Sequence, residues 1–199
     1  MARINWTKRE TMMAFALYRV LPSNCINDRN PEIQRLASAL GRTPSAVKMK
    51  IENLKRCDPV RVAAGQRGLP NGSKLEPLIW EEYLEQGDEY LGQAISLLTE
   101  VLNGEAVTPE VRYALIELPP EGKERMTQRV ERANQQYFRN SLLQNYNGKC
   151  CVTGLAVPEL LVASHIKPWA VADPKTERLS PSNGLLLVCS QIKVDTWGC

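Results

Sequence analysis

The sequence predicts an α+β chain, in which a mostly helical N-terminal part precedes a small β structure. Apolar residues recur at helical spacing in segments up to residue 146. Further on, two short apolar runs, 160–163 and 185–187, flank a loop of turn-forming and charged residues. At 199 residues the chain is long enough for two small domains.

Three helices are predicted at the N-terminus because each begins at a recognisable cap. A capping-box pattern at 7–10 opens the first helix, which stops at Pro22. Asn-Pro at 30–31 opens the second, which ends at Gly41, and Thr-Pro at 43–44 opens the third. These helices make up a first predicted domain, 1–60.

The second and third of these helices, joined by a short turn, form a helix-turn-helix pattern. In DNA-binding proteins of this kind the later helix enters the major groove. Ser45, Lys48 and Lys50 are therefore candidate contacts to bases or phosphates. For this segment alone, a plain three-helix bundle with a solvated basic face is slightly favoured.

Residues 61–118 are predicted to form a linker with additional helices. The stretch 58–73 is rich in Gly, Pro and Arg, and helices are expected over 75–84 and 91–102. Prolines between 107 and 122 mark the boundary of a third predicted domain, 119–199. That domain begins with a long charged helix, or two short ones, over 123–146.

The β structure of the third domain is expected to carry the only histidine of the chain, His165. The apolar run before it predicts a buried strand that Pro168 stops, so the imidazole lies at the strand end. A second apolar run follows Asn183-Gly184, a dipeptide that favours a tight turn with positive φ. Residues 150–153 are expected to form a further short strand.

Composition bounds the function without deciding it. The net charge of +3 and the pI near 8.5 permit a nucleic-acid partner without requiring one. No apolar run approaches a membrane span and residues 1–20 do not resemble a signal peptide, so we expect a cytoplasmic protein with no membrane partner. The six cysteines lack a C-x-x-C pair, so free thiols are expected and not a zinc knuckle.

Three stretches carry a resemblance to a known family. They are Ala-Ser-His-Ile-Lys-Pro-Trp at 163–169, Glu-Arg-Leu-Ser-Pro-Ser-Asn-Gly-Leu-Leu-Leu at 177–187, and a lead-in made of 135–143 and 146–154. Together they resemble HNH (ββα-metal) endonucleases, in particular bacterial, restriction-associated proteins whose front domain the N-terminal half also resembles. The resemblance implies a small C-terminal ββα-metal domain that acts on DNA. Beside such a domain, DNA contact by the third helix is favoured.

The resemblance also implies roles for individual residues in metal-dependent hydrolysis of DNA phosphodiester bonds. His165 matches the general base, and Asn183 matches the asparagine that fixes the loop or orients this base. Ser164 occupies a metal-ligand position, and Asp195 is a candidate ligand in the tail; magnesium, manganese, nickel or zinc is the expected ion. On chemistry rather than motif, Arg139 and Lys167 are candidate phosphate clamps.

The sequence departs from the family pattern after residue 187. The family continues into a short helix with a second histidine, whereas this chain has one histidine, and the last helix is expected to be truncated. Loss of a metal ligand predicts a weak or inactive nuclease. The alternatives are a non-catalytic DNA-binding protein derived from an HNH nuclease and, least favoured, a helical interaction module. For His165 alone, the alternative is a hydrogen-bonded histidine near a small core. Cutting of both DNA strands would suggest a homodimer.

Overall fold

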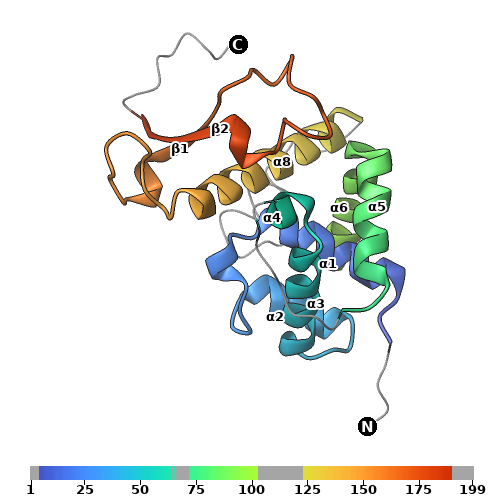
Figure 1. Cartoon of the computed structure of the whole chain (residues 1–199). Coiled ribbons are helices and arrows are strands. Elements are labelled where there is room, and N and C mark those ends of the chain that lie inside the picture. Colours follow the sequence, from blue (N-terminus) through green and yellow to red (C-terminus); the bar gives the residue numbers. More distant parts are fainter. Residues whose placement is uncertain (1–4, 64, 66–71, 103–122, 190–199) are drawn as a thin grey trace. The chain divides into compact units, whose positions relative to one another are not determined.

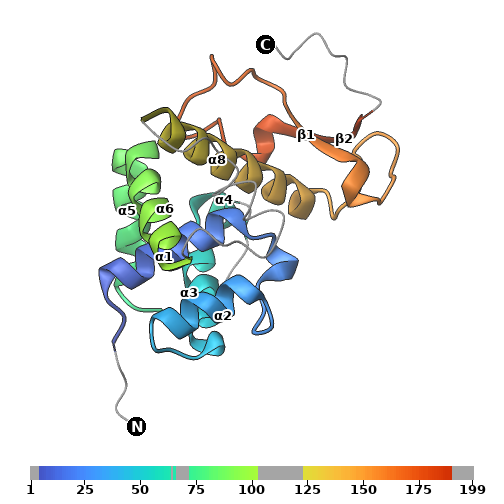
Figure 2. The same ribbon diagram turned by 180° about the vertical axis from the view of Figure 1, so that it is seen from behind.

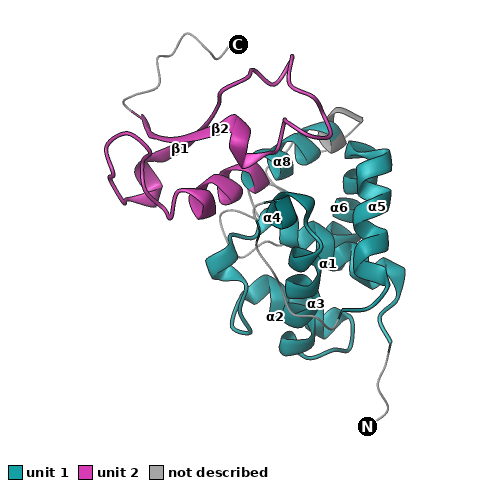
Figure 3. Cartoon of the chain, in the orientation of Figure 1, with its two compact units in different colours: residues 1–136 teal, residues 137–199 magenta. Residues whose placement is uncertain are grey.

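The computed structural model describes residues 5–63, 65, 72–102 and 123–189, and it divides the chain into two units. Unit 1 comprises residues 1–136 and unit 2 comprises residues 137–199 (Figure 3). The described part of unit 1 is helical, and unit 2 carries a two-stranded antiparallel sheet. The predicted α+β class is therefore confirmed. The structural division falls inside α8 (Lys123–Asn145), which contributes residues to both units.

Helix α1 (Lys8–Val20) is the centre of unit 1 and packs against α3, α5 and α6 (Figures 1 and 2). It begins at the predicted capping box, since the Thr7 hydroxyl accepts from the Glu10 amide and the Glu10 carboxylate accepts from the Thr7 amide. The sequence predicted one apolar stripe, but every residue from Thr11 to Val20 is buried. Neighbouring helices cover α1 on several sides, which a single-helix pattern does not reveal.

Helices α2 (Pro31–Ala39) and α3 (Pro44–Arg56) begin where the caps predicted. The side chains of Asn30 and Thr43 accept the amides of the first turns, and a proline stands at the first position of each helix. Gly41, with φ +61°, lies in the turn between them, and the two helices pack together.

The remaining helices of unit 1 complete its core. Short α4 (Pro59–Ala63) follows α3, while α5 (Leu75–Gln86) and α6 (Asp88–Leu102) lie side by side in both views (Figures 1 and 2). The ring of Phe15 meets those of Trp80 and Tyr83 at centroid distances of 5.1 and 5.3 Å. The indole of Trp80 donates to the Leu54 carbonyl, which ties α5 to the end of α3.

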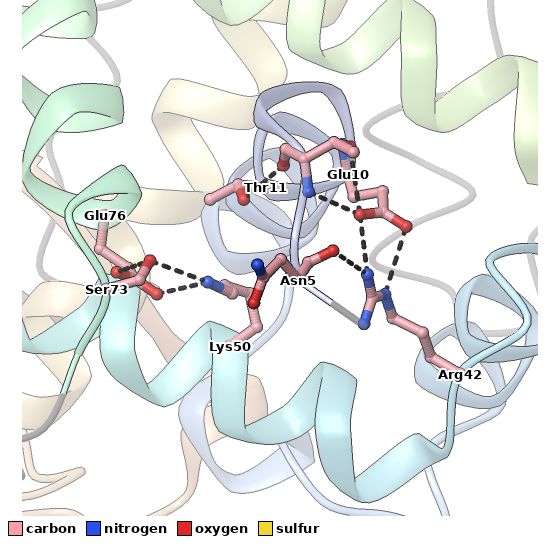
Figure 4. Close-up of polar contacts among 8 residues, drawn as sticks. Asn5, Glu10, Thr11, Arg42, Lys50, Ser73 and Glu76 are labelled. Carbon is pink, nitrogen blue, oxygen red and sulfur yellow. Dashed lines mark hydrogen bonds and ion pairs between the residues drawn. The ribbon is translucent and has the colours of Figure 1, made fainter. Parts of the chain in front are cut away.

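A pair of ionic contacts lies inside unit 1 (Figure 4). The Lys50 ammonium of α3 is 2.5 Å from a carboxylate oxygen of Glu76 on α5, and their side chains are 4% and 0% exposed. The guanidinium of Arg42 is bound by the Glu10 carboxylate at 2.9 Å. The first contact links α3 to the start of α5, and the second links the turn before α3 to the start of α1. Because both partners of each pair are present, their burial is compensated.

Unit 2 is built on the C-terminal end of α8 and the antiparallel strands β1 (Leu161–His165) and β2 (Gly184–Val188). The register of the two strands pairs His165 with Gly184 and Leu161 with Val188. A small core joins the helix to the sheet, comprising Phe138, Leu142, Cys150, Leu161 and Leu186. Short 3-10 helices precede the strands, η2 (Pro158–Leu160) and η3 (Pro181–Asn183); a third, η1 (Ser23–Cys25), lies in unit 1.

Two local predictions for unit 2 are wrong. Residues 151–153 form a turn and not a strand. The Cys150 amide donates to the Leu155 carbonyl across this turn, and the Cys151 amide donates to the Leu186 carbonyl of β2, which holds the turn against the sheet. Gly184 has φ −142° and does not form the expected positive-φ turn. A Cβ atom there would lie 2.6 Å from Cζ of Phe138, so glycine is needed for close packing rather than for a left-handed backbone.

Among the residues that the structure describes, no helix is long and apolar enough to cross a membrane.

Candidate active site

His165 ends β1, and three neighbours surround its imidazole. The ring stacks on Phe138 of α8, with centroids 3.9 Å apart and an angle of 6° between the planes. Trp169 meets it edge to face at 5.6 Å. Its Nε2 lies 2.8 Å from the carbonyl oxygen of Arg178. The imidazole is thus held by a ring from α8 and by a ring and a carbonyl from the loop between the strands.

The contact with Arg178 assigns the proton of the neutral imidazole. A backbone carbonyl can only accept a hydrogen bond, so Nε2 of His165 must carry the hydrogen. In the neutral ring the lone pair then lies on Nδ1, which is the nitrogen able to take up a proton. The geometry therefore makes Nδ1 the basic atom of the candidate site.

Asn183 lies beside His165 and fastens the chain that follows it. Its Oδ1 accepts from the Lys167 amide at 2.7 Å, and its Nδ2 donates to the Lys167 carbonyl at 3.2 Å. The backbone carbonyl of Asn183 also accepts from the amide of Ile166 at 3.0 Å. The residue is 9% exposed, so these bonds satisfy an amide that would be costly to bury alone.

The two predicted phosphate clamps of unit 2 occupy different places. Lys167 follows His165 on the Asn183-bound segment, and its ammonium forms an exposed ion pair with Glu177. A hydrogen bond from Lys167 lowers the pKa of the Glu177 carboxyl. Arg139, on α8, donates to the carbonyls of Leu161 and Pro158 and so braces the start of β1, at the opposite end of that strand from His165.

The predicted metal ligands do not form a group in the described part of the chain. Ser164 precedes His165 in β1, and because side chains alternate along a strand it projects from the opposite face. Asp195 lies outside the described residues, as does the expected truncated helix. Within 5–63, 65, 72–102 and 123–189, no three His, Cys, Asp or Glu side chains gather as metal ligands would. These residues therefore do not fit a divalent-metal site by themselves.

The predicted DNA-contacting residues of α3 are found in unit 1 with acidic partners. The Ser45 hydroxyl donates to Asp28 at 2.8 Å, and the Lys48 ammonium lies 3.4 Å from the same carboxylate. Ser45 and Lys48 are near the surface, whereas Lys50 is buried against Glu76. The ion pair accounts for Lys50 without DNA.

Two neighbours of His165 were not singled out from the sequence. Trp169 belongs to the quoted 163–169 stretch, and Arg178 to the 177–187 stretch, yet nothing in their spacing indicates that they meet. The Arg178 guanidinium lies 5.2 Å from the Trp169 ring centroid, and its Nε donates to the Trp169 carbonyl at 3.1 Å. Long-range contacts of this kind arise only when the loop folds back on itself.

A comparison with known families matches the segment that carries these residues. Residues 150–191 match the family model described as HNH endonuclease. No curated protein and no solved structure matches the chain significantly. The matched segment contains β1, β2 and the loop between them, and therefore both His165 and Asn183. Residues 150–191 of this chain are thus similar to HNH endonucleases, and this similarity points to nuclease activity.

Proposed function

We propose that unit 2 hydrolyses phosphodiester bonds of DNA, with His165 as the general base. The observation that carries this proposal is the hydrogen bond from Nε2 of His165 to the Arg178 carbonyl, inside the segment that matches an HNH endonuclease. It leaves Nδ1 as the nitrogen that can accept a proton from water.

In the proposed reaction, Nδ1 of His165 removes a proton from a water molecule as its oxygen attacks phosphorus. The P–O bond to the leaving oxygen breaks, that oxygen takes a proton from solvent water, and the proton on Nδ1 returns to solvent. Asn183 holds the segment after His165 in place through the Lys167 backbone. We assign the contact with the reacting phosphate to Lys167, whose ammonium stabilises developing negative charge, and a contact with a neighbouring phosphate of the DNA to Arg139, which lies at the other end of β1. The resemblance to HNH endonucleases implies a divalent metal; because the described residues do not fit such an ion, no step is assigned to it.

We also propose that α3 contacts DNA through Ser45 and Lys48. The support is the predicted helix-turn-helix pattern, the position of both residues near the surface and the net positive charge of the chain. Both residues contact Asp28, so a phosphate would have to compete with this carboxylate. The expected signature is DNA binding that weakens steeply as salt is raised, because phosphate contacts release counterions.

The test is cleavage of supercoiled plasmid by the full chain with magnesium, manganese, nickel or zinc. We expect nicked or linear product from the unaltered chain, and loss of product for His165→Ala because no other imidazole is available. Linear product formed directly would indicate paired cuts, as by a homodimer. Lys175→Ala is a matched control, since the bond from Lys175 to Asp173 uses its backbone amide. Cleavage that survives His165→Ala contradicts the assigned base.

A second candidate function is non-catalytic DNA binding by a protein derived from an HNH nuclease. It is favoured by the single histidine of the sequence and by the missing ligand group in the described part of the chain. Salt-sensitive DNA binding without cleavage under any of the four metals would select this candidate. Cleavage that depends on both metal and His165 would reject it.

A further inference from the structure

The loop between β1 and β2 is closed around His165 by three mutual contacts. The His165 ring meets the Trp169 ring, the Trp169 ring lies under the Arg178 guanidinium, and the Arg178 carbonyl accepts from His165. Each residue of this triangle therefore touches the other two. The contacts join the end of β1 to a position 13 residues further along the chain.

Arg178 makes two kinds of contact in the triangle. Its side chain fastens the turn after β1, because Nε donates to the carbonyls of Trp169 at 3.1 Å and Ala172 at 3.2 Å. Its backbone carbonyl receives the Nε2 hydrogen of His165. Its amide also donates to the Asp173 carbonyl at 3.0 Å. Residue 178 is thus attached to the preceding turn by both side chain and backbone, while its carbonyl faces the imidazole.

We propose that Arg178 is a positioning residue for His165, and that its side chain keeps its own carbonyl and the Trp169 ring against the imidazole. This inference rests on the proposed function, in which His165 Nδ1 is the base. The Arg178 side chain acts through the loop and does not touch the reacting atoms. When Nε no longer binds the two carbonyls, the loop is released, and the imidazole can adopt the tautomer that places its hydrogen on Nδ1.

The competing role for Arg178 is that of a phosphate clamp, as expected for an arginine in a nuclease. Arg178→Lys separates the two roles. Lysine keeps the positive charge that attracts phosphate, but it lacks the Nε–H that serves the Trp169 and Ala172 carbonyls. A positioning role therefore predicts that Arg178→Lys behaves like Arg178→Gln. A clamp predicts that it behaves like the unaltered chain.

The first measurement uses the single histidine of the chain. The full chain, prepared without a histidine tag and labelled with 15N-histidine, gives nitrogen resonances from His165 alone. At pH 9, where imidazoles are neutral, we expect the pattern of a ring protonated at Nε2. In Arg178→Lys and Arg178→Gln we expect a mixture of tautomers, and in Lys175→Ala the unaltered pattern. An Nε2-protonated ring in both Arg178 variants, with loop folding intact, overturns the inference.

The second measurement is plasmid cleavage by the same variants. We expect kcat to fall by about 10- to 100-fold, because small misplacements of a reacting group have effects of this size, while KM and DNA affinity stay nearly unchanged. Loss of DNA affinity in Arg178→Gln with rescue by Arg178→Lys would instead identify a clamp. Where a variant has no folded β1–β2 pair by amide resonances, the other variant decides. If the unaltered chain does not cleave, the proposed function fails, but the tautomer measurement still decides the role of Arg178.

Discussion

At the scale of single residues, the site depends on amide and carbonyl groups as much as on the imidazole. Asn183 uses both ends of its side-chain amide on the backbone of Lys167, two residues after His165. Few residue types suit this position, because the side chain must both accept and donate a hydrogen bond while it is nearly buried. Aspartate is similar in size but offers no donor when ionised.

Two substitutions at Asn183 test the hydrogen bonds between its side chain and the Lys167 backbone. Asn183→Ala removes both bonds, and we expect a loss of roughly 1–3 kcal/mol in the unfolding free energy, from about 0.5–1.5 kcal/mol for each bond. Asn183→Asp keeps the acceptor for the Lys167 amide but opposes the Lys167 carbonyl, so we expect a similar loss at neutral pH. Urea unfolding of the full chain measures both. Asn145→Ala, at an exposed end of α8, is the control. Equal stability of all variants would contradict a stabilising role of the Asn183–Lys167 bonds.

At the scale of elements, β2 and α8 meet at Gly184, which pairs with His165 across the sheet. A Cβ atom at Gly184 would lie 2.6 Å from Phe138 Cζ and 2.8 Å from both Cδ atoms of Leu142. Phe138 also carries the His165 ring on its face. The closeness of this strand to this helix therefore determines where the imidazole lies.

Gly184→Ala tests the packing of β2 on α8. We expect a stability loss of about 1–3 kcal/mol from overpacking, together with altered His165 nitrogen resonances because Phe138 must move. Thermal unfolding and the 15N-histidine spectrum report the two effects. Adding Leu142→Val removes both Cδ atoms, so the double variant should lose less stability than the sum of the single changes. If the stability losses of the two single variants simply add in the double variant, contact with Leu142 is not what excludes a Cβ atom at residue 184.

At the scale of the whole molecule, a buried ion pair of unit 1, Lys50–Glu76, makes the stability of the chain depend on pH. Burial raises the pKa of the Glu76 carboxyl, but hydrogen bonds from Lys50 and Ser73 outweigh it and leave that pKa below the usual value. The stabilisation is therefore present above the unfolded-state pKa of about 4.3. It is lost as the pH falls through the lowered folded-state pKa.

The expected result is acid destabilisation that depends on the Lys50–Glu76 pair. Glu76→Gln leaves a buried ammonium without its counter-charge, so we expect a loss of about 3–5 kcal/mol at pH 7. Glu76→Gln should lose less of its unfolding free energy on acidification than the unaltered chain does. Lys50→Met combined with Glu76→Leu should restore most of the stability. Urea unfolding between pH 7 and pH 3 measures the unfolding free energy of each variant, and exposed Glu85→Gln is the control. If the unfolding free energy of Glu76→Gln falls with pH as steeply as that of the unaltered chain, the Lys50–Glu76 pair is not the cause of the acid destabilisation.

Sequence alone determined the α+β class, the starts of α1, α2 and α3, and the strand that ends at His165, because caps and apolar periodicity act within a few residues. It also indicated the matched HNH segment. Tertiary structure decided the extended Gly184 and the burial of Lys50. It also decided the contacts of Arg178 and Trp169 with His165. These depend on groups that lie from four to 46 residues apart along the chain and meet only on folding.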